Sequence, residues 1–433
     1  MKRASIGCFV VAATLVFAGA ATTYARNISG VSSLKLAKPL TQDVSAQSRG
    51  AAIARFKVDL WEWMKEEADV SVDTTNTIQR FHFFNFADSC LTHAKVDQTL
   101  SGHTVTTTIA LPGEEASSTL EAYNNRCYSI SLRFYTLMKK ALEENAATDL
   151  YNLGINTIYY TMGRMGTPIG LPDESTPRSF LLEESRKIMQ NFFNKFAVRS
   201  PEFIITGKPG TTLARQLTIQ VVVDTAPLAG IALAGVLPGG KKLCAGTTDA
   251  SGSISFSSFR IPFVAKGTAL FLKPDFSVTV PGSAPFDAGD LGITVPEQTL
   301  LFNIIPATFS VSYRANSASA VVIPKDFSSD GYITKYLHDS CFLAPAPYGA
   351  GADLYFTIVN QVSSYAQDEQ EQTVLKLESD IVIEDANRQQ LAKKQGVVFE
   401  KGYENAVQIP MGLFFWEAAS KSMKMLKEMV VGL

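Results

Sequence analysis

Residues 247–256 read TTDASGSISF, and this stretch marks a change from a helical to a β-strand pattern along the chain. The polar run that ends at Gly252 is typical of a tight turn, and Ser253–Phe259 after it has the composition of a strand. Similar short strands are predicted nearby, each ended by Pro, Gly or Asp, at Gln216–Val223, Gly230–Val236 and Thr268–Leu272. Strands at this spacing predict a β-sandwich over residues 213–300.

Two short segments of this middle region are similar to a known family. Pro227–Gly230 reads PLAG and is followed by the turn and strand of residues 247–256. This order resembles the carboxypeptidase-regulatory or transthyretin-like sandwich, in which a strand leads into a Thr-Asp-x-x-Gly turn and the next strand returns. The resemblance implies an immunoglobulin-like (Ig-like) fold for residues 213–300, and it implies no particular activity.

The region before the sandwich, residues 26–205, is predicted to be a helix-rich α/β domain. Apolar side chains recur there at three- and four-residue steps, which is the pattern of amphipathic helices. The predicted helices are Asp43–Ala68, Glu114–Asn145, Ala147–Met165 and Arg178–Val198. From Val70 to Leu111 the period changes to two, which predicts strands. Ser101 and Gly102 form a candidate hairpin turn between two of these strands, Leu91–Leu100 and His103–Leu111.

The region after the sandwich, residues 307–433, is predicted to be a small mixed α/β domain. Its predicted strands are Thr308–Tyr313, Asp353–Ala366 and Thr373–Glu384, the last two as antiparallel partners, and its predicted helices are Tyr332–Asp339 and Met411–Val431. With the regions before it, this predicts an α+β multidomain protein. Such a division suits a chain of 433 residues, which is too long for one ordinary core.

The first 25 residues predict export. Met1–Arg3 is basic, the residues from Ala4 to Ala20 are small and apolar, and small-x-small cleavage sites end at Ala20 and Ala25. The apolar run is shorter than the ~20 residues of a membrane span, and no later stretch reaches ~18 uncharged apolar residues. We therefore expect a signal peptide over residues 1–25, no transmembrane segment after its removal, and a periplasmic or extracellular protein.

The composition argues against several functional classes. Lys plus Arg number 39 and Asp plus Glu number 41, so no basic excess indicates nucleic-acid binding. Only four histidines are present, without the tight spacing of metal ligands. The serine-hydrolase motif Gly-x-Ser-x-Gly and the zinc-protease motif are absent, and no phosphate-binding glycine loop follows a strand. The sequence therefore predicts no cofactor and assigns no catalytic residue.

Four cysteines follow the signal peptide, at positions 90, 127, 244 and 341. In an oxidising compartment four cysteines allow three pairings. Cys90 and Cys127 fall in the same predicted domain, so they are the candidate disulfide. Cys244 and Cys341 fall in different predicted domains, and either a bridge that needs close domain docking or two free buried thiols is consistent with the sequence.

The residues from 326 to 334 match the first half of a calcium-binding loop. Oxygen atoms fall at every second position, on Asp326, Ser328 and Asp330. Position twelve of the loop is Leu337, where a bidentate carboxylate normally completes the ligand shell. The loop is therefore incomplete unless Asp339 or another strand supplies that ligand. The alternative interpretation is a turn that caps the following helix.

A second motif overlaps the end of this loop. His338, Asp339 and Cys341 bring a thiol near an imidazole, which is the pairing of a cysteine nucleophile. The alternative is a helix end with a solvated His–Asp pair and a buried cysteine. His82 is interpreted as a core histidine on a strand. Two aromatic stripes, Phe192–Phe196 and Phe414–Trp416, are also interpreted as core, although Phe415 is a candidate to face outward.

The order of the predicted elements carries a second resemblance. It rests on the helix Val44–Met64, the polar hairpin after it, the helix Glu114–Asn145 and the closing strand–strand–helix unit. This order resembles bacterial envelope proteins with domains like those of small outer-membrane lipoproteins and flagellar-ring assembly proteins. The resemblance implies assembly rather than catalysis, and it transfers no functional residue. The chain departs from the lipoprotein members because it has no lipid-bearing cysteine after a lipoprotein signal.

Three functions are consistent with the sequence. The first is a non-catalytic structural or assembly component of the bacterial cell envelope or surface, whose partners are envelope or surface proteins or copies of itself. The second is a periplasmic or secreted protein that binds a carbohydrate or peptide, which an aromatic pocket between the first and third regions would favour. The third is a hydrolase with dispersed carboxylates. The missing catalytic motif and the near-zero net charge favour the first.

Overall fold

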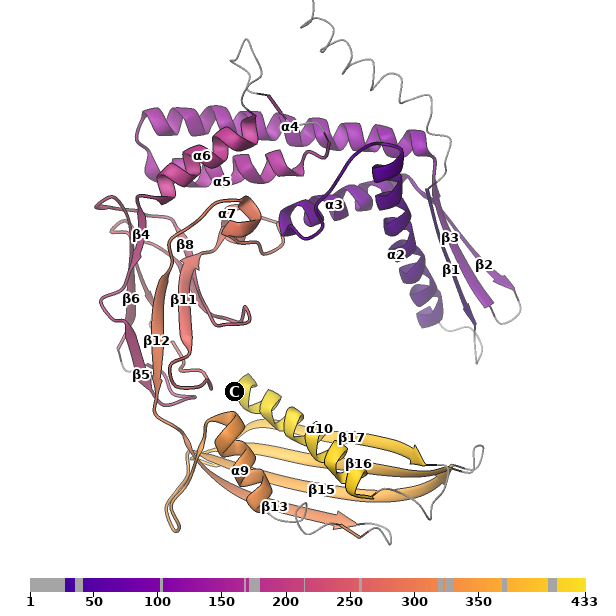
Figure 1. Ribbon diagram of the computed structural model, residues 1–433, viewed down its shortest axis with the longest axis vertical. Coiled ribbons are helices and arrows are strands. Elements are labelled where there is room, and N and C mark those ends of the chain that lie inside the picture. The colour runs from indigo at the N-terminus through magenta and orange to yellow at the C-terminus, as the bar shows by residue number, and fades with distance from the viewer. Residues whose placement is uncertain are drawn as a thin grey trace, which may run out of the picture.

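The computed structural model shows a mixed α+β protein. It describes residues 28–35, 42–101, 104–166, 169–170, 180–213, 215–256, 259–317, 322–323, 330–367, 372–403 and 411–433. These residues form an open arch (Figure 1). A small sheet with two helices forms one end, the helices of residues 113–193 cross the top, two sheets descend on the far side, and a larger sheet lies at the other end.

Two sequence predictions concern export and membranes. The predicted signal peptide, residues 1–25, lies outside the described residues. Among the helices that the structure does describe, none has both the length and the hydropathy that a membrane span requires.

The N-terminal part, residues 28–111, contains an antiparallel sheet and two helices. The strand order is β1–β3–β2, with bounds β1 Ile28–Lys35, β2 Lys95–Ser101 and β3 Thr104–Leu111. α2 (Gln42–Glu66) packs on β1 and β3. Its apolar side chains, among them Phe56, Leu60 and Trp63, enter a core shared with the sheet. The predicted first helix is confirmed. The predicted hairpin is present as β2 and β3, but its first strand begins at Lys95 rather than Leu91, and Ser101, expected in the turn, is the last residue of β2 and pairs with Thr104.

α3 (Thr77–His93) is a helix where strands were expected. Asn76 caps it, because its side-chain oxygen accepts hydrogen bonds from the backbone N–H groups of Ile78 (3.0 Å) and Gln79 (3.1 Å). Its buried side chains recur with the helical period, at Ile78, His82, Phe83, Phe86, Ala87 and Cys90. The alternating aromatics of the sequence FHFFNF gave a false period of two. The cap residue Asn76 and the three- and four-residue spacing of the buried side chains are the sequence signals that identify the helix.

Three helices cross the top of the arch, α4 (Gly113–Glu143), α5 (Ala147–Gly163) and α6 (Leu181–Phe193). All three were predicted, although α6 ends earlier than expected. One hydrophobic core contains side chains from these helices and from the two sheets that follow, for example Tyr151, Phe193, Leu233 and Phe302. The expected domain boundary between residues 205 and 213 therefore lies within a single packed core.

Two sheets follow the helices. The first has the strand order β10–β6–β4, with β7 also paired to β6, and the second has the order β5–β12–β11–β8–β9. The bounds are β4 Phe196–Arg199, β5 Ile204–Gly207, β6 Leu217–Val223, β7 Ala226–Pro227, β8 Ala232–Val236, β9 Lys242–Thr247, β10 Ser253–Phe256, β11 Ala269–Pro274 and β12 Gln298–Ile304. The short helices α7 (Phe276–Thr279) and α8 (Ala288–Leu291) lie between β11 and β12. The sheets thus begin before residue 213 and end after residue 300.

The TTDASG segment connects the two sheets, because it joins β9 to β10. Oδ1 of Asp249 accepts hydrogen bonds from the backbone N–H groups of Ser251 (2.8 Å) and Ser253 (3.0 Å). Hydrogen bonds from Ser251 and Ser253 hold the pKa of this carboxyl below its usual value. Thr248 Oγ1 donates to the carbonyl oxygen of Leu228 at 2.7 Å. The segment therefore positions strands rather than a ligand site.

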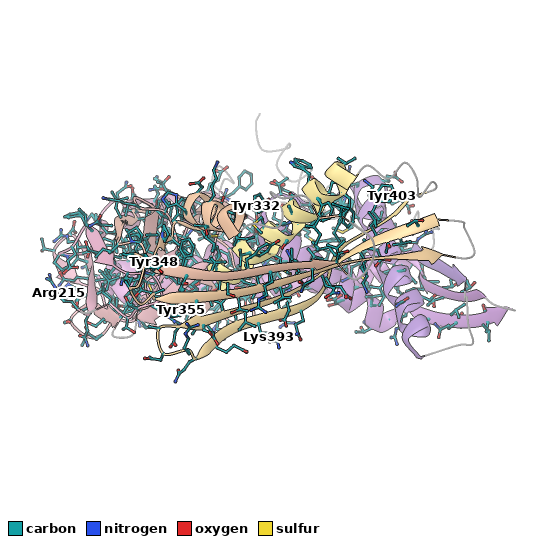
Figure 2. The ribbon with its side chains drawn as sticks, turned by 90° about the horizontal axis from the view of Figure 1, so that it is seen from below. Arg215, Tyr332, Tyr348, Tyr355, Lys393 and Tyr403 are labelled. Carbon is teal, nitrogen blue, oxygen red and sulfur yellow. The ribbon has the colours of Figure 1, made fainter. Side chains whose placement is uncertain are left out.

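The C-terminal part, residues 307–433, contains a five-stranded sheet in the order β14–β13–β15–β16–β17. The bounds are β13 Thr308–Ser317, β14 Ala344–Pro345, β15 Leu354–Gln367, β16 Gln372–Asp385 and β17 Gln390–Tyr403. β13 pairs with β15 in parallel, and β15, β16 and β17 are successive antiparallel partners. α9 (Asp330–Cys341) and α10 (Met411–Gly432) cover one face of the sheet, and the face that carries Tyr355 and Lys393 is open (Figure 2). The predicted pairing of β15 with β16 is confirmed, whereas the edge strand β17 was missed.

Several polar contacts join the parts of the arch. The backbone N–H of Thr77, at the start of α3, donates to Oδ1 of Asp290 in α8 at 2.7 Å. Nε of Arg186, on α6, donates to the carbonyl oxygen of Leu291 at 2.8 Å. Nζ of Lys208, after β5, lies 2.9 Å from Oδ1 of Asp353, before β15. These contacts fix the two ends of the arch relative to its middle.

Candidate functional site

A hollow of about 860 Å³ lies between α2 and α3. The corner between these helices opens toward the inside of the arch (Figure 1). We call the hollow the α2–α3 groove, and its lining residues are Ala54, Lys57, Val58, Trp61, Glu62, Lys65 and Glu66 of α2, Thr74 of the connecting segment, and Arg80, Phe83 and Phe84 of α3. The groove thus combines an apolar floor with a charged rim.

The floor of the groove is aromatic. The rings of Trp61 and Phe83 meet edge to face with centroids 5.9 Å apart, and those of Phe83 and Phe84 are 5.7 Å apart. Val58 and Phe84 remain 59% and 41% exposed. Phe83 belongs to the core beneath the groove and Trp61 packs against that core, whereas Val58 and Phe84 do not contribute to it. The exposed part of the floor is therefore made by Val58 and Phe84.

Cationic side chains hold the aromatic rings in place. Nζ of Lys57 lies 2.8 Å from Oδ1 of Asp88 and 5.1 Å from the centroid of the Phe84 ring. Nζ of Lys65 lies 6.0 Å from the centroid of the Trp61 ring. Cation–π contacts of this kind are worth about 0.5–1 kcal/mol at exposed sites.

The chemistry of the groove suits recognition. An apolar floor about two to three helical turns long, with charges at its sides, is the surface that an amphipathic helix fits. Among the described residues, no group of three His, Cys, Asp or Glu side chains is arranged to hold a metal ion. The lining of the groove is therefore a mixture of aromatic, aliphatic and charged side chains.

A buried histidine lies under the contact between α3 and α4. Nδ1 of His82 is 2.8 Å from the hydroxyl of Tyr123, and its ring centroid is 4.6 Å from that of Tyr159. Burial lowers the pKa of His82 to about 4, and the backbone of Tyr159 opposes this shift only in part. Burial also raises the pKa of Tyr123. Neither group exchanges a proton near neutral pH, so His82 is a packed core residue, on a helix rather than on the expected strand.

The predicted calcium loop falls largely outside the described residues. Asp326 and Ser328 lie outside them, and Asp330 is the first residue of α9. Leu337, at the position of the closing carboxylate, is fully buried in the core of the C-terminal part. Asp339, the proposed substitute ligand, lies 2.7 Å from Nδ1 of His338. The described half of the loop therefore carries no closing ligand.

Cys90 and Cys127, the candidate disulfide, are both free thiols in this structure, so the pairing stays a prediction. Cys90 points into the core that α3 shares with α2 and the sheet, whereas Cys127 lies on α4 beside Tyr123. Burial raises the pKa of Cys127 to about 11 and that of Cys90 to about 12. Cys244 and Cys341 are also free, which agrees with the second of the two alternatives for that pair, two free thiols rather than a bridge.

The cluster at the end of α9 forms a His–Asp pair without a nucleophile. His338 bonds to Asp339 and both side chains are exposed. Cys341 is buried, and burial raises the pKa of its thiol to about 11. A nucleophilic cysteine needs the opposite shift. The alternative interpretation, a solvated pair and a buried cysteine, is confirmed.

The aromatic stripes are mostly core, as predicted. Phe192, Phe193 and Phe196 are buried together. Phe414 and Phe415 are both buried against the C-terminal sheet, so the outward orientation expected for Phe415 is wrong. Trp416 is instead the outward residue, with 72% of its side chain exposed.

The α2–α3 groove was not predicted from the sequence. The first helix was predicted correctly, but the segment of α3 was interpreted as strand, so no surface between two helices was expected. The available signals were Val58 and Phe84, apolar residues that fall outside the buried period of their helices. Because these two residues meet at one groove, they form a contiguous exposed apolar patch rather than scattered single side chains.

Comparison with known proteins adds no relative. No protein-family model matches this chain, and no curated protein matches its sequence significantly.

Proposed function

We propose that this protein is a non-catalytic structural or assembly component of a bacterial cell envelope or surface, and that it acts through protein–protein contacts. The observation that carries the proposal is the α2–α3 groove, in which the exposed side chains of Val58 (59%) and Phe84 (41%) lie beside the ring of Trp61, which also packs against the core. The arch supports it as well, since it presents the groove on one rigid end of an extended body.

Location and domain architecture belong to the same proposal. The basic, apolar and small-residue order of positions 1–25 supports export to the periplasm or the cell exterior. The packing of two sheets on one core and the connecting turn at Asp249–Gly252 support an Ig-like sandwich in the middle part.

A periplasmic or secreted peptide- or carbohydrate-binding protein is the alternative function. Its aromatic pocket was expected between the first and third regions, whereas the groove lies within the N-terminal part. The aromatic floor still suits a peptide segment, and the test below distinguishes a protein partner from a small ligand.

A photoreactive amino acid at position 58 tests the proposal. Val58 and Val278 are similarly exposed, at 59% and 57%, but Val278 lies on α7, away from the groove. We expect irradiation of cells that export the chain to give a covalent protein adduct of defined mass from position 58 and none from position 278. Absence of an adduct at position 58, or equal adducts at both positions, would contradict a protein-docking role for the groove.

A further inference from the structure

A cavity of about 170 Å³ lies where the end of α5 meets the first turns of α3 and α6. We call it the α5 cavity. Most of its wall is apolar, and the apolar lining residues are Val72, Met162, Met165, Ile169, Phe180 and Leu182. None of its described lining residues belongs to the α2–α3 groove, so the cavity is a separate feature of the molecule.

Hydrogen bonds hold the wall of the α5 cavity in place. The side chain of Asn124, on α4, donates to the carbonyl oxygen of Met165 at 2.7 Å and accepts from the backbone N–H of the same residue at 2.9 Å. The backbone N–H of Leu181 donates to the carbonyl oxygen of Ile169 at 2.8 Å. The cavity is therefore preformed, which lowers the cost of ordering the protein around a ligand.

Arg164 is the only charged side chain among the described lining residues of the cavity. It directly follows α5, and the carbon atom of its guanidinium lies 5.2 Å from the centroid of the Tyr128 ring. No carboxylate in the described part of the chain forms an ion pair with it, and burial lowers its pKa. Arginine nevertheless stays protonated in proteins, and a partly buried cation is normally paired with an anion. The guanidinium is therefore a charge without a counter-ion beside the cavity.

Gln79, on α3, adds hydrogen-bond donors to the lining. Its Oε1 accepts a hydrogen bond from the backbone N–H of Asp73 at 2.7 Å, which fixes the orientation of the amide. Its Nε2 has no hydrogen-bond partner among the residues that the structure describes. The cavity is thus lined by unused N–H donors and by no described carboxylate. A carboxylate on a ligand would complement both Arg164 and Gln79.

The size of the α5 cavity limits the rest of the ligand. An apolar cavity of about 150 Å³ is large enough to bind benzene. The α5 cavity, at about 170 Å³, therefore has room for one six-membered ring and little more. Met162 and Met165 lie in its wall, and thioether sulfur atoms make favourable contacts with aromatic rings. A compact ligand with one aromatic ring fits this wall best.

We propose that the α5 cavity binds a small aromatic monocarboxylate, with the ring against the methionines and the carboxylate paired with Arg164 and Gln79. The proposal goes beyond the proposed function, because it concerns a small ligand and a part of the molecule that the groove does not include. The ligand carboxylate supplies the counter-ion that Arg164 lacks. An apolar wall with a few polar groups that fix the orientation of the ligand is the usual form of a small-molecule site.

Isothermal titration calorimetry of the protein with sodium benzoate tests the proposal. We expect one site per chain with a dissociation constant below about 10 mM. Benzamide has the same ring but a neutral amide in place of the carboxylate, so we expect it to bind weaker by about tenfold or more. Equal affinities for benzoate and benzamide, or no saturable binding of benzoate, would overturn the proposal.

Two substitutions test whether benzoate occupies this cavity. Arg164→Gln removes the cation, and Gln79→Glu keeps an acceptor for the N–H of Asp73 but adds a negative charge beside the ligand. We expect each to weaken benzoate binding by about tenfold or more. Arg126→Gln and Gln220→Glu make the same changes at exposed positions on α4 and β6, outside the cavity, and are expected to bind benzoate as the wild type does. Equal affinities in the cavity variants and the controls would contradict the assignment.

NMR spectra of the methionine methyl groups locate the ligand in the wild type without any substitution. Benzoate is expected to shift the methyl signals of Met162 and Met165, because its ring lies against them. The signal of Met423, which is buried in the core of the C-terminal part, is expected to stay in place. If Met162 and Met165 do not shift while benzoate binds, the ligand lies elsewhere and the proposal is wrong.

Discussion

Nζ of Lys208 lies 2.9 and 3.0 Å from the two carboxylate oxygens of Asp353, across the junction between the middle and C-terminal parts. Oδ2 of Asp353 also accepts hydrogen bonds from the backbone N–H and the hydroxyl of Thr308, both at 2.7 Å. Burial acts to raise the pKa of Asp353, but the bonds from Thr308 and Lys208 outweigh it and hold the pKa below its usual value. One carboxylate thus joins the segment after β5 to the starts of β13 and β15.

Removal of this carboxylate is expected to loosen the C-terminal part. Asp353→Ala leaves the N–H of Thr308 without its acceptor and is expected to destabilise by about 1–3 kcal/mol. Lys208→Met removes a half-exposed ion pair and is expected to cost about 0.2–1 kcal/mol. Urea denaturation measures both. A matched control is Lys195→Met, whose partner Asp224 is 3.5 Å away in an exposed pair. Equal costs for Asp353→Ala and the control would contradict a junction role.

Gly252 is expected to tolerate no side chain. Its φ is +69°, and a Cβ there would lie 2.6 Å from the carbonyl oxygen of Val221 and 2.8 Å from the backbone nitrogen of Leu228. Both neighbours are backbone atoms and cannot move aside without disturbing the strands. Gly252→Ala is therefore expected to cost more than the ~1–2 kcal/mol of a left-handed backbone alone. Thermal or urea unfolding measures the loss.

Gly282→Ala is the control for this effect. Gly282 has φ of +82° but nothing within 4 Å of the position of its missing Cβ. The loss of stability in Gly282→Ala therefore measures the cost of the left-handed backbone alone, without the close approach that Gly252→Ala adds. If the two variants lose the same stability, the contact between Gly252 and Val221 has no energetic role.

The neutral His82 predicts a loss of stability in mild acid. Its pKa is about 4 in the folded protein and about 6.5 when unfolded, so below pH 6.5 the unfolded chain binds a proton that the folded chain excludes. Stability therefore falls as the pH drops from about 6.5 towards 4, by at most about 1.4 kcal/mol per pH unit. His82→Gln is expected to flatten this slope in urea unfolding series, whereas His93→Gln, at the exposed end of the same helix, leaves it in place. An unchanged slope in His82→Gln would assign the acid sensitivity to other groups.

Elements with a strong helical or alternating pattern were predictable from the sequence. The helices α2, α4 and α10 and the pair β15–β16 bury one face each, so their apolar residues recur with the period of the element. α3 was missed because its aromatic residues also cover positions outside the buried face, where Phe84 borders the groove. β17 was missed because it is an edge strand, and its Lys393, Lys394 and Gly396 interrupt any alternation.

The candidate site was less predictable than the fold, for a physical reason. The exposed part of the groove is formed by residues outside the buried face of their own helix, Val58 and Phe84, and a periodic pattern does not separate such residues from the core. Catalytic and metal motifs are local in sequence, so the sequence offered candidate sites at Asp326 and Cys341 rather than at the groove. The close approach of α2 to α3 is a tertiary contact, and the residue spacing within either helix does not predict it.

Removing one partner of the buried hydrogen bond between Ser379 and Asn360 is expected to destabilise the C-terminal part. Oγ of Ser379 donates to Oδ1 of Asn360 at 2.6 Å, Nδ2 of Asn360 donates to the hydroxyl of Tyr313 at 3.2 Å, and the first two side chains are buried between two hydrophobic clusters. Ser379→Ala leaves the buried Oδ1 of Asn360 without its donor and is expected to lower the free energy of unfolding by about 1–3 kcal/mol. Adding Asn360→Leu removes that acceptor. The double variant is therefore expected to lose less stability than the two single variants combined. Ser363→Ala, a less buried serine on β15, is the control and is expected within about 0.5 kcal/mol of the wild type. Strictly additive costs in urea unfolding would show that the two side chains act independently.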